Sequence, residues 1–282
     1  MLVRPMEVYK YKSVSTRQDF ERLRDIILNN HIYMPSPLML NDPMEANAVV
    51  MSLGIMGSGY ISACGKIHSF IEEKQERYRV LSLSAIPNST IMWAHYAKEY
   101  SGCCLIYSTE RTLSDIVPVI YTDSTFEFSD GEFPDDDMPQ AIQESLQFKR
   151  KDWSYENEWR VIQQKDAGYL DYEEDELLGI IIGENMKSKM ANKIEKLCKR
   201  KDVACFRTYT MKSLYDIAFI SYDLSKEFTS KEFEYITPYD MREHIMKKRE
   251  DGQCARNEFE LFFRSVYKEL HADHETGAAD NK

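Results

Sequence analysis

The chain has 282 residues, 43% of them hydrophobic and 29% charged, and a formal net charge of -11. This composition is ordinary for a globular protein long enough to bury a substantial core. The acidic balance disfavours general nucleic-acid binding, because the phosphate backbone is also negative. No apolar run approaches the roughly 18 residues of a membrane span, and the first residues lack a signal-peptide pattern. We therefore expect a cytoplasmic protein with no membrane association.

The six cysteines are scattered and none forms a CxxC pair. Zinc-ligand spacing is absent, and the adjacent pair Cys103 and Cys104 cannot easily form a disulfide with each other. We expect reduced, buried thiols and no metal site at the cysteines.

Hydrophobic periodicity predicts short strands that alternate with helices. In chain order, the predicted strands are residues 7–12, 31–34, 80–84, 103–108, 117–121, 159–163, 179–183, 203–208 and 215–222. The predicted helices cover residues 16–27, 61–71, 90–101, 142–150 and 186–197, and the third has an N-cap in Asn88-Ser89-Thr90 and a C-terminal cap at Gly102.

The order of these elements predicts an α+β fold with small mixed sheets flanked by helices. We expect one main domain over residues 1–222 and a solvated acidic loop over residues 123–137. A charged helical extension follows over residues 223–272, and a disordered tail over residues 273–282.

Two polar segments in the first 45 residues are candidate ligand sites. In YKYKS, a strand places Lys10 and Tyr11 on opposite faces. In NDPME, a loop presents Asn41, Asp42 and Glu45 to a polar ligand or a cation. An edge strand, and a turn whose side chains bond their own backbone, are the structural alternatives.

The helical segment IMWAHY contributes Trp93, His95 and Tyr96, and it follows a predicted strand that ends at Ser84. On a helix, Trp93 and Tyr96 share one face, and His95 and Tyr96 share another. His95 is either a hydrogen-bonded structural residue or part of a site beside Ser84.

The stretch KDWSYENEWR holds two of the three tryptophans of the chain. If residues 153–161 are extended, the aromatic side chains face one way, and Glu156, Glu158 and Arg160 face the other. Packing explains the aromatic residues, whereas the charged row is either an ion network or a site with a positioned carboxylate. We expect Glu158 to be anchored by Arg160 and Glu156 to be more exposed, and we rank Glu158 first for chemistry.

Five segments taken together, from residue 9 to about residue 185, resemble the bacterial family catalogued as domain of unknown function 2971. They are YKYKS, NDPME, MWAHYAKEYSGCCL, KDWSYENEWRVI and GIIIG, in this order. The more specific parts are WAHY followed by Gly-x-Cys-Leu, and Trp-x-Tyr-Glu-x-Glu-Trp-Arg. The resemblance implies a bacterial protein that is often associated with defence or mobile regions.

The order of Lys10 or Tyr11, Ser84, and Glu156 or Glu158 is also similar to that of the functional residues of ADP-ribosyltransferases. This second similarity implies that NAD binds between two facing small sheets. The first-strand residue would hold the nucleotide, the serine would line the nicotinamide pocket, and a glutamate would orient the ribose. Cleavage of the nicotinamide bond passes through an oxocarbenium-like state that a carboxylate stabilises.

The leading hypothesis is therefore an NAD-using ADP-ribosyltransferase-like or glycohydrolase effector in bacterial defence or toxin biology, with NAD as substrate and no other cofactor. The catalytic candidates are Glu158, Glu156 and His95. The substrate-binding candidates are Lys10, Tyr11, Asn41, Asp42, Ser84, Trp93, Tyr96 and Arg160.

Two alternatives stay open. The first is a metal-dependent phosphodiesterase or nuclease that uses Asp42, His95 and the acids of KDWSYENEWR. The second is a non-catalytic module that binds a nucleotide or peptide in an aromatic cleft. A single site requires Tyr11, Asn41, His95 and Glu158 to converge on one pocket.

Overall fold

The computed structural model describes residues 3–42, 45, 48–50, 73, 75–124, 126–128, 138–166, 168–211 and 216–222. These residues form strands and a smaller number of helices, which confirms the α+β class. The predicted helix over residues 61–71, the C-terminal extension and the tail lie outside the described residues, and the single main domain over residues 1–222 stays a prediction. In the described part of the chain, no helix has the length and apolar character of a membrane span.

The chain divides into two compact units that are interleaved along the sequence. Unit 1 comprises Met1–Val8, Asn30–Ala85 and Ser108–Glu176, and unit 2 comprises Tyr9–Asn29, Ile86–Tyr107 and Leu177–Lys282.

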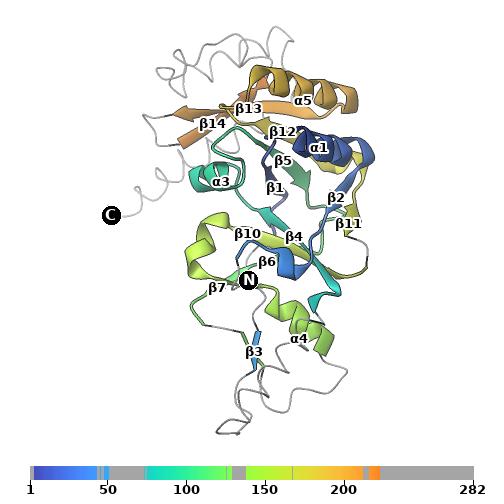
Figure 1. The fold of residues 1–282 in the computed structure, drawn as a ribbon, viewed down its shortest axis with the longest axis vertical. Coiled ribbons are helices and arrows are strands. Elements are labelled where there is room, and N and C mark those ends of the chain that lie inside the picture. The colour runs from blue at the N-terminus through green and yellow to red at the C-terminus, as the bar shows by residue number, and fades with distance from the viewer. Residues whose placement is uncertain are drawn as a thin grey trace, which may run out of the picture. The chain divides into compact units, whose positions relative to one another are not determined.

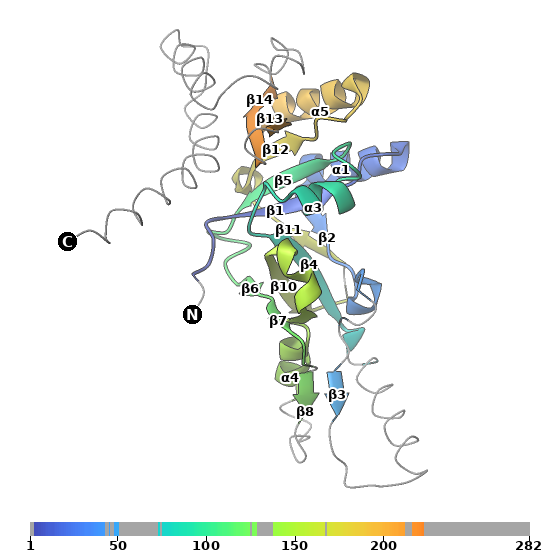
Figure 2. The ribbon, with the colours of Figure 1, turned by 90° about the vertical axis from the view of Figure 1, so that its left-hand side faces the viewer.

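Unit 2 contains a mixed sheet with the strand order β14-β13-β12-β5-β1. Strand β12 pairs in parallel with β13 and antiparallel with β5, and β13 pairs antiparallel with β14. Helix α5 connects β12 to β13, packs on both strands and contacts α1 (Figure 1), and it lies along one side of these strands (Figure 2). The elements are β1 (Glu7–Lys12), α1 (Arg17–Asn29), α3 (Thr90–His95), β5 (Cys103–Ser108), β12 (Leu177–Ile182), α5 (Ser188–Lys201), β13 (Ala204–Met211) and β14 (Asp216–Ser221).

The core of unit 2 follows from the apolar runs of the sequence. The sequence of β12 is a continuous apolar run, which is typical of a central strand that is buried on both faces. Cys103, Cys104 and Cys198 are buried, as predicted, whereas Cys205 is only half-buried. Burial raises the pKa of the Cys103 thiol to about 12, so this thiol is unreactive at neutral pH.

Helix α3 is shorter than the sequence predicts. Its N-cap is Ser89, whose hydroxyl accepts a hydrogen bond from the Met92 amide at 3.3 Å. The predicted continuation to residue 101 is wrong, because the chain leaves the helix after His95 and then places Lys98, Glu99 and Tyr100 at positive φ. Such a left-handed run costs roughly 1–2 kcal/mol per residue, and two hydrogen bonds from Asn185, at 2.9 and 3.0 Å, help to hold it.

Unit 1 is built around the antiparallel pair β4 and β10, with β6 on the other side of β10. Small two-stranded sheets pair β2 with β11, β3 with β8 and β7 with β9. The helices are α4 (Met138–Ser145) and the 3-10 turns η1 (Pro37–Met39), η2 (Lys151–Glu156) and η3 (Glu174–Glu176). The strands are β2 (His31–Tyr33), β3 (Ala48–Val50), β4 (Tyr78–Ser84), β6 (Val117–Pro118), β7 (Ile120–Thr122), β8 (Phe126–Phe128), β9 (Phe148–Arg150), β10 (Glu158–Gln164) and β11 (Tyr169–Asp171).

An apolar cluster joins α4 to β4 and β10. Tyr78 and Val80 from β4 pack with Ile162 from β10, and Ile142 and Leu146 cover them from α4 and its C-terminal end. Because side chains alternate along a strand, Ile162, Arg160 and Glu158 share one face of β10. This face therefore changes from apolar to charged along its length.

Candidate functional site

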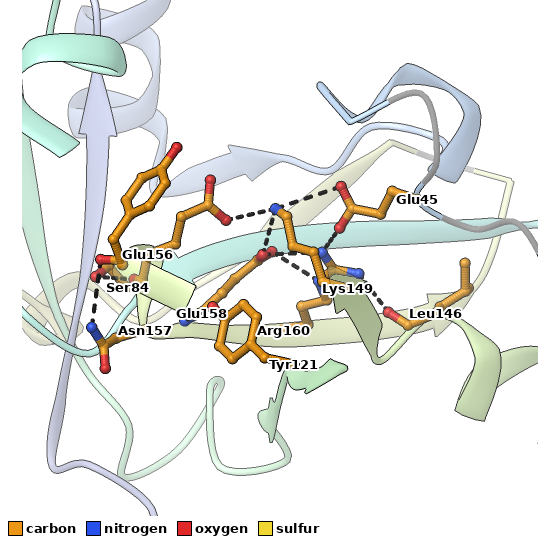
Figure 3. A network of polar contacts seen from close by, with 10 residues as sticks. Glu45, Ser84, Tyr121, Leu146, Lys149, Glu156, Asn157, Glu158 and Arg160 are labelled. Carbon is orange, nitrogen blue, oxygen red and sulfur yellow. Dashed lines mark hydrogen bonds and ion pairs between the residues drawn. The ribbon is translucent and has the colours of Figure 1, made fainter. Parts of the chain in front are cut away.

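Five charged side chains gather at the charged end of this β10 face (Figure 3). We call them the ionic cluster: Glu45, Lys149, Glu156, Glu158 and Arg160. Each side chain is no more than 4% exposed. A buried charge is costly unless it is paired, so the cluster depends on its internal contacts.

The pairing of β4 with β10 fixes two members of the ionic cluster. Arg160 lies opposite Ser82, and Glu158 lies opposite Ser84. The Ser84 hydroxyl donates to the carbonyl oxygen of Glu156 at 2.7 Å. Ser84 therefore holds the backbone at the start of β10.

The chain enters β10 through a turn and not through an extended segment. Residues Lys151–Glu156 form η2, and Asn157 adopts a left-handed conformation with φ 45°. The prediction that residues 153–161 are extended is therefore wrong for the half before Glu158. Asparagine tolerates this conformation better than most residues, so the turn has a local cause in the sequence. The turn folds Glu156 back, so that its carboxylate and that of Glu158 contact the same ammonium group.

Lys149 from β9 is the centre of the ionic cluster. Its Nζ donates to Glu156 Oε2 at 2.5 Å and to Glu158 Oε2 at 2.9 Å, and it lies 3.5 Å from Glu45 Oε2. One ammonium therefore links the η2 turn, β10 and the loop that carries Glu45.

Arg160 holds the other side of Glu158. Its Nε donates to Glu158 Oε1 at 2.8 Å and its Nη2 to Oε2 at 3.0 Å, which is the bidentate geometry that suits a guanidinium and a carboxylate. Nη1 donates to the Leu146 carbonyl at 2.6 Å, just after α4, and Nη2 also forms an ion pair with Glu45. The predicted anchoring of Glu158 by Arg160 is confirmed.

Three carboxylates share two cations in the ionic cluster, so the buried charge is unbalanced. Burial raises the pKa of Glu158 to about 7; Lys149 opposes this rise and Glu156 adds to it. Burial also lowers the pKa of Arg160 to about 9 while Asp42 acts to raise it, so the guanidinium stays charged at neutral pH. Burial first, and the nearby Glu156 carboxylate second, therefore favour the protonated form of Glu158 more than in an exposed glutamate.

Burial lowers the pKa of Lys149, but the charges of Glu158 and Glu156 outweigh this effect and the net pKa is raised. Lys149 is therefore a permanent cation. The Tyr121 hydroxyl accepts a hydrogen bond from the Glu158 amide at 2.8 Å, and burial raises its pKa. Tyr121 is therefore a neutral residue that fixes the first residue of β10.

Aromatic rings of η2 border the ionic cluster. Trp153 and Tyr155 are both half-buried, and their ring centroids are 6.1 Å apart with planes tilted by 36°. The Lys149 ammonium lies 5.0 Å from the centroid of the Trp153 ring, within the range of a cation–π interaction.

Of the predicted site residues, unit 1 brings together Glu156, Glu158 and Arg160, with the Ser84 hydroxyl on the Glu156 backbone. Asp42 is buried and acts on the charge of Arg160, while Asn41 is exposed.

The expectation that Glu156 is more exposed than Glu158 is wrong. Glu156 is 3% and Glu158 is 4% exposed, because the 3-10 turn buries a side chain that an extended strand would have left near the surface.

The other predicted residues lie in unit 2, where the geometry of Tyr11 and Trp93 is that of packing. The Tyr11 hydroxyl donates to the Ile86 carbonyl at 2.9 Å, and its ring meets Trp93 edge-on at 5.3 Å. Trp93 is fully buried and donates to the Pro87 carbonyl at 2.7 Å. His95 is exposed at the end of α3, and Lys10 and Tyr96 are half-buried. Convergence of Tyr11, Asn41, His95 and Glu158 on one pocket stays a prediction.

Sequence reasoning missed Lys149, the residue with the most ion pairs in the cluster. Its neighbours Arg150 and Lys151 are also basic, so composition alone does not distinguish it. The predicted helix over residues 142–150 is also wrong for its last three residues, which form the strand β9, and there Lys149 is buried and Arg150 is exposed.

In the described part of the chain, no group of three or more His, Cys, Asp or Glu side chains is arranged to hold a metal ion. The carboxylates of the ionic cluster form ion pairs with Lys149 and Arg160.

Residues 92–161 match the model of the family described as Protein of unknown function (DUF2971). The match includes WAHY and the segment from Trp153 to Arg160, and it confirms the family resemblance on which the sequence reasoning relied. No curated protein and no solved structure matches the chain. The similarity to ADP-ribosyltransferases therefore rests on residue order alone.

Proposed function

We propose that this chain cleaves the bond between nicotinamide and ribose in NAD, as an ADP-ribosyltransferase-like enzyme or a glycohydrolase. We propose further that it is an effector in bacterial defence or toxin biology. The observation that carries the proposal is the pair of carboxylates, Glu156 and Glu158, held on the single ammonium of Lys149. Most enzymes that cleave glycosidic bonds use a pair of carboxylates.

The chemistry follows from the charges. When the carbon–nitrogen bond breaks, its electron pair goes to the nicotinamide nitrogen and the ribose carbon becomes cationic. A carboxylate close to this carbon stabilises the cation. Water or an acceptor group then forms the new bond at the ribose carbon, and its proton passes to a base.

The contacts favour different roles for the two glutamates. Glu158 accepts from Arg160 through both oxygens and from Lys149 through one of them, so we assign it to positioning and to charge balance. Glu156 lies at the end of a surface turn, between half-buried Tyr155 and exposed Asn157. We therefore assign Glu156 to the ribose, which reverses the order of the two glutamates inferred from the sequence.

The test is the release of nicotinamide from NAD by the purified chain, followed by chromatography with and without a chelator. We expect release at the same rate in both samples, because Lys149 and Arg160 supply the positive charge of the ionic cluster. If no nicotinamide appears, while nucleic acid is cut only when magnesium is present, the proposal is wrong and the metal-dependent alternative holds.

The effector role has a cellular test. Expression of the chain in bacteria should lower the cellular NAD content and stop growth, and the Glu156→Gln variant should do neither. Growth arrest with an unchanged NAD content would contradict the proposal.

A further inference from the structure

Trp153 and Tyr155, the two rings on η2, differ in exposure from the other two tryptophans of the chain. Trp93 and Trp159 are buried, whereas Trp153 is half-buried, as is Tyr155. A tryptophan that served only to fill a core would be placed as Trp159 is. Indole surface left in contact with water adds little to stability, so the exposed part of the Trp153 ring is open to a ligand.

Lys149 connects the Trp153 ring to the carboxylates. The same ammonium that lies 5.0 Å from the ring centroid donates to Glu156 at 2.5 Å. The ring therefore stands within about one side-chain length of the carboxylate that we assign to the ribose. In a nucleotide, the ring and the ribose carbon are joined directly, so a ring held against Trp153 places that carbon near η2, the turn that carries Glu156.

The charges beside η2 fit the rest of a nucleotide. Arg150 and Lys151 immediately precede the rings, and their side chains are 51% and 60% exposed. Their partners, Asp152 and Asp123, are also exposed, and such surface ion pairs are weak. A phosphate can therefore compete with Asp123 for Lys151.

We propose that Trp153 and Tyr155 form a stacking surface for the planar heteroaromatic ring of a nucleotide, next to Glu156. This inference rests on the proposed function and deepens it, because it names the residues that recognise the ring of the substrate. Both the nicotinamide ring and the adenine ring of NAD have the required chemistry, and the two halves of the molecule can be tested separately.

The test uses intrinsic tryptophan fluorescence, since Trp153 is more exposed than Trp93 and Trp159. Nicotinamide mononucleotide and AMP are titrated into the full chain, with ribose 5-phosphate as the control that lacks a ring. We expect quenching by one or both nucleotides and none by ribose 5-phosphate. In Trp153→Phe the quenching should disappear, while binding measured by calorimetry persists, because phenylalanine still offers a ring.

Removal of the Trp153 ring measures how much that ring contributes to the affinity for the nucleotide. Base–aromatic stacking of about 1–3 kcal/mol corresponds to roughly 5- to 150-fold in binding, so Trp153→Ala should weaken the nucleotide by that factor. Tyr169→Ala removes a half-exposed ring from another part of unit 1 and should leave binding unchanged. Equal affinity of Trp153→Ala and the wild type, with both chains folded by circular dichroism, would overturn the inference.

Failure of the inference and failure of the proposed function are distinguishable. Quenching at Trp153 without any release of nicotinamide retains the stacking surface and rejects the chemistry. If the wild type releases nicotinamide, and the variants Trp153→Ala and Trp153→Phe both bind and react as it does, the stacking surface is rejected and the chemistry is retained.

Discussion

Replacement of Lys149 by methionine tests whether the ionic cluster holds unit 1 together. Lys149→Met keeps a long apolar stem and removes one charge, so three buried carboxylates are left with the single cation Arg160. Removal of one partner from a buried ion pair costs roughly 3–5 kcal/mol, because the remaining charge is uncompensated. We expect a loss in this range in the free energy of unfolding, measured by urea denaturation.

A neighbouring lysine provides the matched control. Lys151 pairs with Asp123, and the two side chains are 60% and 65% exposed. Lys151→Met removes the same charge from water, where an ion pair contributes roughly 0–1 kcal/mol. The two variants should therefore differ by roughly 3 kcal/mol, although they lie two residues apart.

A double variant identifies the cause of the loss. If the orphaned carboxylates destabilise Lys149→Met, then Glu156→Gln in the same chain should restore at least about 1 kcal/mol. A loss in Lys149→Met that is no larger than in Lys151→Met would refute the electrostatic reasoning, as would a further loss in the double variant.

Two other predictions concern backbone packing and pH. A Cβ on Gly102 would clash with the carbonyl oxygens of Lys12 and Ala97, whereas a Cβ on Gly168 would meet first the movable ring of Tyr33. Gly102→Ala should therefore lower the free energy of unfolding by about 2 kcal/mol or more, and Gly168→Ala by clearly less. Thermal unfolding of the two variants checks this ranking, and equal losses would contradict it. The raised pKa of Glu158, about 7, means that the folded chain keeps a proton that the unfolded chain releases near pH ~4.3. The stabilisation is complete below that pH and is lost as pH rises through about 7, so the wild type should lose stability relative to Glu158→Gln over this interval; a constant difference from pH 4 to 8 would show that Glu158 does not hold the proton.

The sequence predicts the elements that repeat a simple pattern. Alternation identifies β10 within one residue at each end, because the apolar Trp159 and Val161 alternate with the charged Arg160. The same two-residue period correctly predicts that Arg160 anchors Glu158. The apolar run in β12 is likewise sufficient to identify a buried central strand.

The rest of the ionic cluster depends on contacts that local patterns do not encode. Asn157 ends η2 in a left-handed conformation, and Glu156 is buried at the end of this turn. The prediction that residues 153–161 are extended does not include such a turn. Glu45 meets Arg160 only through the tertiary fold, since a loop residue has no periodicity that indicates its partner. The run Lys98–Tyr100 was missed for a related reason, because Asn185, far along the chain, helps to hold that conformation in place.

The most direct test of the central claim is the rate of nicotinamide release from NAD by the wild type, by Glu156→Gln and by the surface control Glu110→Gln. Glutamine still accepts the hydrogen bond of Lys149, and it removes the excess negative charge of the ionic cluster, so the melting temperature should stay close to that of the wild type. The rate of Glu156→Gln should fall by roughly 100-fold or more, and that of Glu110→Gln should not change. A wild-type rate in Glu156→Gln, or a loss of activity that only follows a loss of folding, would contradict the assignment of the ionic cluster as a catalytic site.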